Sequence, residues 1–179
     1  SDTFKSNYES ELESGYISNG ELGGKLKHDF TIDKKINSKK LIEGIASASP
    51  YIPRFDSLGQ FKLNTIPING NVNPDHIVKA NDIINFTYNR TKVEEVYTKV
   101  EFKYNWDYAR GNFSHVVPDI TINSGSTFDY YNLPSDHSKS TLVVEDDRGK
   151  YIRDHASAMS FANWLLSWHR NQHIKIKLK

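Results

Sequence analysis

The stretch that decides the fold is VYTKVEFKY, residues 96–104. One set of alternate positions is mainly apolar, and the set between them is mainly charged or polar. The first set is Val96, Thr98, Val100, Phe102 and Tyr104, and the second is Tyr97, Lys99, Glu101 and Lys103. Successive side chains of a strand point to opposite faces, so this alternation is typical of a strand with one buried face. We therefore expect a long strand whose apolar face lies against the core.

Downstream of this strand, residues 154–178 predict a helix that leads into a final strand. Asp154 is a suitable N-cap, and apolar side chains then recur three or four residues apart. These side chains are Ala158, Phe161, Ala162, Leu165 and Trp168. Asn171 ends the helix, and residues 173–179 alternate polar and apolar, as a strand does.

Upstream, the pattern predicts two short helices among several strands. Asn37 is a candidate N-cap for a helix over residues 39–47, and Asn73 before a proline opens a second helix that ends near Lys79. Further strands are expected at residues 25–32, 51–55, 60–66, 83–88 and 116–122, and a hairpin at residues 141–145 and 150–152. Pro118 places the strand over residues 116–122 at an edge of its sheet.

The expected fold class is therefore α+β, rich in strands, with one clear C-terminal helix and two short helices. Residues 1–24 form a polar arm, and residues 25–179 form a single α+β domain. The chain starts at Ser1, its only Met is Met159, and the alternation of the last strand is still running at Lys179. We expect from these three observations that the chain is a segment of a longer polypeptide.

The composition excludes several classes of protein. The 23 basic and 22 acidic side chains nearly balance, which argues against a nucleic-acid-binding protein. The chain has no Cys, so it has no disulfide framework, no thiolate nucleophile and no cysteine zinc site. No apolar run approaches the length of about 18 residues that a membrane span needs, so we expect no stable membrane insertion.

Residues that could carry catalysis or bind a metal do not assemble into a recognisable motif. The closest pair of histidines is His169 and His173, but Asn171 interrupts the helix that would bring them together on one face. No nucleophile elbow, phosphate loop or dinucleotide fingerprint occurs. We expect no metal, no cofactor and no enzymatic activity. Two acidic side chains from distant strands could still form a glycosidase site, which sequence spacing does not show.

An aromatic row extends the long strand. It consists of Tyr104, Trp106, Tyr108 and Phe113, with Arg110 beside it. Aromatic side chains on alternate positions could stack on sugar rings, so a carbohydrate-binding module or a glycan-processing domain is the alternative function. The interpretation that we favour is that these rings fill a core or a subunit interface, since interfaces are enriched in Tyr, Trp and Arg.

Three stretches together resemble one family, the tail-tip and baseplate-hub proteins of tailed phages, which include the central tail proteins similar to host-specificity protein J. The first is LIEGIASA, residues 41–48, followed by YIPRFDSLGQFKL, residues 51–63. The second is residues 96–108, and the third is DHASAMSFANWLL, residues 154–166, which leads into the final strand. The resemblance covers residues 38–179 in order, and each of its motifs is short.

This resemblance implies a structural component of a phage tail tip or baseplate hub. Such a protein acts by assembly with itself, as a suspected trimer, and with other tail proteins, and not by catalysis. It would reside in the tail of the virion and take part in host attachment, and it would be found in the host cytoplasm during virion assembly. In that setting, Tyr104, Trp106, Tyr108, Arg110 and Phe113 are candidate interface contacts.

Overall fold

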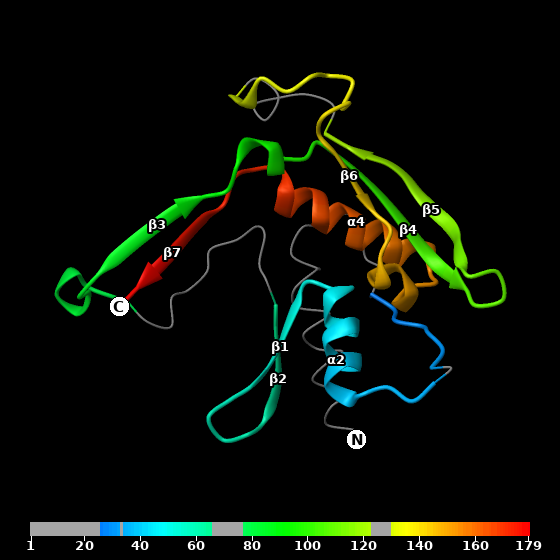
Figure 1. The fold of residues 1–179 in the computed structure, drawn as a ribbon, viewed down its shortest axis with the longest axis horizontal. Helices are drawn as coiled ribbons and strands as arrows, with labels where there is room; N and C mark the ends of the chain where they lie inside the picture. Colours follow the sequence, from blue (N-terminus) through cyan, green and yellow to red (C-terminus); the bar gives the residue numbers. More distant parts are fainter. Residues whose placement is uncertain (1–25, 33, 66–76, 123–129) are drawn as a thin grey trace.

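The computed structural model describes residues 26–32, 34–65, 77–122 and 130–179, and it confirms the α+β fold class (Figure 1). The predicted polar arm, residues 1–24, lies outside the described residues. In chain order the elements are α2 (Ser38–Ser47), β1 (Tyr51–Phe55), β2 (Phe61–Thr65), η2 (Ala80–Asp82), β3 (Phe86–Arg90), η3 (Val93–Glu95), β4 (Lys99–Asp107), β5 (Asn112–Thr121), β6 (Thr141–Val144), η4 (Asp147–Tyr151), α4 (His155–His169) and β7 (Ile174–Leu178).

The predicted long strand is β4, and it lies at the centre of a sheet with the order β5-β4-β6. It pairs antiparallel with β5 and parallel with β6. The register with β5 shifts between Val100 and Phe102, so that Pro118 falls within the irregularity. A proline has no N–H to donate to a ladder and is tolerated at bulges and on edge strands. The prediction that Pro118 marks an edge strand is confirmed within the described sheet.

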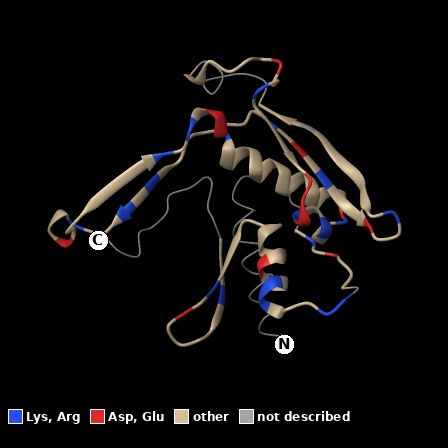
Figure 2. Ribbon diagram, viewed as in Figure 1, with Lys and Arg blue, Asp and Glu red and all other residues tan. Residues whose placement is uncertain are grey.

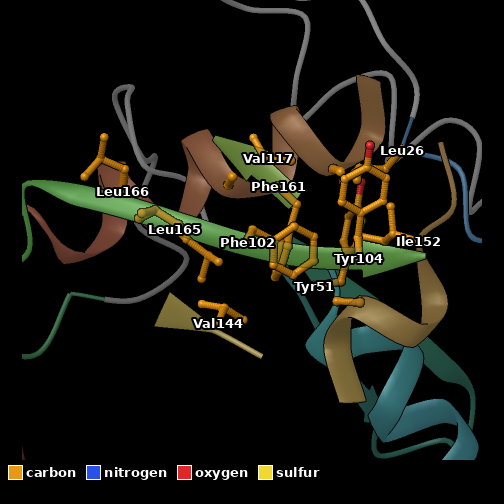
Figure 3. Packing of buried hydrophobic residues seen from close by; sticks show 14 residues of the cluster. Leu26, Tyr51, Phe102, Tyr104, Val117, Val144, Ile152, Phe161, Leu165 and Leu166 are labelled. Carbon is orange, nitrogen blue, oxygen red and sulfur yellow. The ribbon is translucent and has the colours of Figure 1, made fainter. Parts of the chain in front are cut away.

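The helix α4 covers one face of this sheet and encloses the core (Figure 3). The ring of Phe161 meets Phe102 edge-on, with the ring centroids 5.3 Å apart. Asp154 is the N-cap, because its Oδ2 accepts a hydrogen bond of 2.9 Å from the backbone N–H of Ser157. The apolar residues of the core include Val100, Phe102, Tyr104, Val117, Val144, Ile152, Ala158, Phe161, Ala162 and Leu165.

A second group of elements packs beside η4, where α2 and the β1–β2 hairpin lie (Figure 1). Residues 26–31 cross the same region as an extended segment rather than as the predicted strand. The backbone N–H of Lys27 donates to Ser157 Oγ at 2.8 Å, and that of Asp29 donates to the carbonyl of Tyr151 at 3.0 Å. These hydrogen bonds hold the segment against the body without placing it in a sheet.

A two-stranded antiparallel ribbon of β3 and β7 projects from this body (Figure 1). Both strands were expected, β7 where it is found and β3 about three residues earlier. We call residues 86–90 and 174–178 the β3–β7 ribbon and the remaining described elements the body.

Two further expectations need correction. Residues 77–79 are not helical, and η2 is the nearest helical turn among the described residues; residues 73–76 lie outside the described part of the chain. Residues 150–152 do not return along β6 as a hairpin, because β6 pairs in parallel with β4 and the chain then forms η4. The Asp146 side chain caps η4 by accepting from the N–H of Arg148. The acidic residues that predicted the turn of a hairpin therefore begin a helical turn.

Candidate functional site

The structure divides the predicted aromatic row between the core and the surface. Tyr104 belongs to the core, with only 3% of its surface exposed, and its hydroxyl lies 2.8 Å from Nδ1 of His155. Burial, together with the negative charge of Asp154, raises the pKa of Tyr104. A side chain in this position stabilises the fold and is closed to an external ligand.

Trp106 and Phe113 form a cross-strand pair between β4 and β5. Their ring centroids are 4.9 Å apart at an interplanar angle of 73°, and both side chains are partly buried. The Nζ of Lys150 lies 4.5 Å from the centroid of the Trp106 ring. This cation–π contact occupies a face of the indole that a sugar ring would use.

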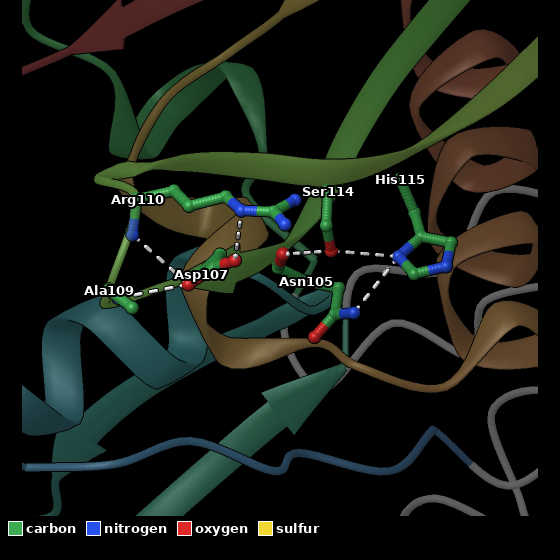
Figure 4. A network of polar contacts seen from close by, with 6 residues as sticks. All are labelled: Asn105, Asp107, Ala109, Arg110, Ser114 and His115. Carbon is green, nitrogen blue, oxygen red and sulfur yellow. Dashed lines mark hydrogen bonds and ion pairs between the residues drawn. The ribbon is translucent and has the colours of Figure 1, made fainter.

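Tyr108 and Arg110 are the exposed members of the row, and both are engaged locally. The Tyr108 hydroxyl donates to the carbonyl of Thr31 at 2.8 Å. The Asp107 carboxylate accepts from the N–H groups of Ala109 and Arg110 at 2.9 and 3.2 Å, and it lies 3.7 Å from the Arg110 guanidinium (Figure 4). Arg110 thus helps to shape the turn between β4 and β5.

A polar network stands next to this turn (Figure 4). The Ser114 hydroxyl donates to the carbonyl of Asn105 at 2.8 Å, and Nδ1 of His115 lies 2.9 Å from both Ser114 Oγ and Asn105 Nδ2. Asn105 adopts a left-handed conformation, with φ of 58°, which asparagine tolerates better than most residues. These contacts join neighbouring positions of one hairpin, and the N–H of Asn105 donates to the carbonyl of Ile152 at 3.0 Å, so we see in them a structural role.

The β3–β7 ribbon presents two chemically different faces, because directly opposed residues of an antiparallel pair point to the same side. Phe86 lies opposite Leu178, Tyr88 opposite Ile176, and Arg90 opposite Ile174. The other face carries Thr87 opposite Lys177 and Asn89 opposite Lys175, and Figure 2 shows the lysines along β7. We call the side with Phe86, Tyr88, Ile174, Ile176 and Leu178 the apolar ribbon face.

The apolar ribbon face is exposed. Tyr88 is 67% exposed and Ile176 is 57% exposed, and every other residue of both strands is exposed as well. Among the described elements, β3 and β7 pack chiefly against each other. Sequence reasoning placed both strands but did not select these residues as a site, although the alternation in IKIKL, residues 174–178, is a signal that could have done so.

The base of the ribbon is firmly joined to the body. The N–H of Thr91 donates to the carbonyl of His173 at 2.9 Å, and the N–H of His173 donates to Thr91 Oγ1 at 2.8 Å. The Gln172 side chain donates to the carbonyl of Thr91 at 2.5 Å, and the N–H of Gln172 donates to the Tyr131 hydroxyl at 3.1 Å. The first three contacts join the ends of the two strands to each other, and the contact with Tyr131 joins this base to the body.

The two closest histidines are both used in packing. The His173 ring stacks on Trp168 with centroids 4.4 Å apart, and its Nε2 lies 2.8 Å from the Trp168 carbonyl. His169 meets Tyr97 edge-on, and burial lowers its pKa, with a further contribution from His173. Within the described ranges, no three His, Asp or Glu side chains gather as a metal would require.

A broad, shallow depression is lined by Ser47, Asp146, Asp147 and Arg148. Its charges neutralise one another, because Arg148 pairs with Asp146 at 2.6 Å and Lys150 pairs with Asp147 at 2.7 Å. Arg148 also holds the pKa of the Asp146 carboxyl below its usual value. This arrangement favours a solvated, ion-paired surface over a pair of acids poised for hydrolysis.

Comparison with known proteins finds no match to this chain among protein families, characterised proteins or solved structures. None of the helices in the described part of the chain has both the length and the apolar character needed to cross a bilayer.

Proposed function

We propose that this chain is a structural component of a phage tail tip or baseplate hub, and that it acts by assembly with itself and with other tail proteins. The observation that carries the proposal is the β3–β7 ribbon, which holds an apolar face away from the body. The order of the motifs at residues 41–63, 96–108 and 154–166 supplies the link to phage tails. The same proposal places the protein in the tail of the virion and, during assembly, in the host cytoplasm.

The energetics of the ribbon support an assembly role. A two-stranded sheet without a covering layer is marginally stable in water. Contiguous apolar surface of this kind on a soluble protein marks an interaction site, and unpaired strand edges invite further pairing. A protein that functions alone would gain nothing from holding Phe86, Tyr88 and Ile176 in solvent. Contact with another protein would bury them and stabilise the ribbon.

The carbohydrate-binding alternative has weaker support. Tyr104 is buried, Trp106 is occupied by Phe113 and Lys150, and only Tyr108 and Arg110 remain exposed in the row. A sugar platform needs an open aromatic face, which the contacts of Trp106 do not offer.

Immunogold electron microscopy of particles from the source tests the proposal, with an antibody raised against this chain. We expect gold at one end of the viral tail. Antibody that has first been absorbed with the purified chain serves as the control and should leave the tails unlabelled. Gold on cell envelopes, or only in soluble fractions, would refute the tail assignment.

A further inference from the structure

The distribution of charge on the ribbon indicates which partner suits its apolar face. Lys175 and Lys177 lie on the face opposite to the apolar ribbon face, and Lys179 continues their row, because it exchanges backbone hydrogen bonds with Asn85. On the apolar side the only charged residue of the two strands is Arg90, at the base. Two apolar ribbon faces can therefore meet without bringing their lysines together.

We propose that the apolar ribbon face packs against the same face of another copy of this chain, so that like ribbons converge on a symmetry axis. The inference rests on the proposed assembly function and names the partner of that surface. A contact between identical patches on a closed symmetry axis is the usual way in which soluble proteins form homo-oligomers. The lysine faces then point outward into solvent on every copy.

The area of the face is sufficient for such a contact. Large apolar side chains each carry about 150–200 Å² of surface, so five that are half exposed or more offer about 500 Å² per copy. Two copies would bury about 1,000 Å² together, which is where specific interfaces between proteins begin. The five exposed fractions run from 50% for Leu178 to 67% for Tyr88.

The ribbon is also organised before any contact forms. Phe86 and Tyr88 stack on each other with ring centroids 5.9 Å apart and an interplanar angle of 27°. The hydrogen bonds of Thr91 with Gln172 and His173 hold the base, and Lys179 accepts from the N–H of Ile84 at 2.7 Å near the tip. A partner that meets a preorganised surface loses less entropy on binding.

Site-specific cross-linking tests the geometry, because the chain has no Cys of its own. Tyr88→Cys places one thiol on the apolar ribbon face, and Asn89→Cys places one thiol on the lysine face as the matched control. A short bis-maleimide should join copies of the Y88C chain and leave copies of the N89C chain unlinked. Failure of Y88C to cross-link, or equal cross-linking of both variants, would overturn the proposal.

Mass measurements test the energetics. Sedimentation of the wild-type chain over a range of concentrations should show an oligomer. Ile176→Lys places an ammonium group in the contact and should raise the dissociation constant by about 100-fold or more, whereas Thr87→Lys adds the same charge on the opposite face and should change it little.

The two proposals fail in different ways. A wild-type chain that stays monomeric at all concentrations would refute the homotypic contact. If its antibody still labels viral tails, the assembly function stands and the ribbon meets another tail protein. If the tails are unlabelled as well, both proposals are wrong.

Discussion

The strand β4 of the body and the β3–β7 ribbon both alternate apolar and polar residues, but only β4 has its apolar face covered. Val100 and Phe102 in β4 are fully buried beneath α4, whereas Phe86 and Tyr88 in β3 are more than half exposed. The two regions therefore differ in the source of their stability. The body is stabilised by contacts within the chain, and the ribbon depends on its anchored base and on whatever covers its apolar face.

On the proposed assembly, the pattern of the ribbon reflects a contact that the isolated chain does not make. Alternation in β7 is as regular as in β4, and in a self-contained domain it would indicate a strand packed on a core. In the ribbon it indicates a surface that another protein is expected to cover. Substitutions in the two regions should consequently have opposite profiles, with large effects on folding in the body and large effects on association in the ribbon.

The largest effect should come from truncating the aromatic core. Phe102→Ala removes a fully buried ring that contacts Phe161, and it should destabilise the chain by about 3–5 kcal/mol. Phe86→Ala removes the same ring from the ribbon and should cost about 1 kcal/mol or less in dilute monomer. Urea unfolding followed by tryptophan fluorescence measures both. Equal losses would mean that the ribbon is already covered within the monomer.

Lowering the pH should weaken the body through His28. Burial lowers the pKa of His28 from 6.5 to about 4, and this outweighs the opposing influence of the Tyr151 carbonyl. The unfolded chain takes up a proton below pH 6.5 while the folded chain does not, so stability falls between pH 6.5 and pH 4. This difference between the folded and unfolded pKa values corresponds to about 3 kcal/mol of stability. We expect a loss of about 2 kcal/mol because the ring keeps partial contact with solvent.

Urea titrations at pH 7.5, 6 and 5 measure this loss. In the variant His28→Phe, the free energy of unfolding should depend only weakly on pH. A small dependence of the same sign should remain, because burial also lowers the pKa of His169. Neither strand of the ribbon contains a histidine. On acidification, protection of backbone amides from exchange should therefore be lost in the body first. A wild-type stability that is flat over this range would contradict the assignment.

Gly149 offers a test of how closely η4 packs on β4. It is buried, and a Cβ at this position would collide with the carbonyl oxygen of Lys103 and approach the ring of Phe113. Gly149→Ala should therefore destabilise the body by about 2 kcal/mol. Gly59→Ala is the control, since Gly59 faces open space and its φ of 74° alone should cost about 1 kcal/mol. Thermal unfolding compares the two, and a harmless G149A would show that η4 can shift.

Local signals predicted much of the fold. The alternation of β4, the cap and apolar spacing of α4, and the turn between β1 and β2 each act within about fifteen residues, and each element was predicted close to its observed position. The hairpin expected at residues 141–152 was wrong because Asp146 can begin a turn or cap a helical turn equally well. The parallel pairing of β6 with β4 joins residues about 40 positions apart in the sequence. Patterns within a short stretch of sequence do not indicate such a pairing.

The candidate site was harder to predict for the same reason. Alternation identified Tyr104, Trp106 and Tyr108 as neighbours on a strand, but the burial of Tyr104 beside His155 depends on α4, which lies about 50 residues downstream. The ribbon pairs Phe86 with Leu178 across the C-terminal half of the chain. The alternation of IKIKL already makes β7 amphipathic, but only its pairing with β3 shows that Phe86 and Tyr88 share the apolar face.

The smallest of the predicted effects concerns the start of α4, which joins the body to residues 26–31. Asp154 Oδ2 accepts from both the N–H and the hydroxyl of Ser157 at 2.9 Å, and Ser157 Oγ in turn accepts from the N–H of Lys27. Asp154→Ala should cost about 1 kcal/mol, and Asp154→Asn, which keeps a capping oxygen, should cost less.

The pKa of Asp154 gives this last prediction a second readout. The hydrogen bonds from Ser157, led by its backbone N–H, hold that pKa below 3.8, so the cap is intact at neutral pH and is lost as pH falls through the folded-state value. The stability difference between wild type and D154A should shrink in acid. Asn37→Ala, at the cap of α2, is the matched control. The Asn37 side chain does not titrate, so the stability difference between wild type and N37A should not vary with pH. If both differences shrink alike, the acid effect lies elsewhere in the body and the cap is not its origin.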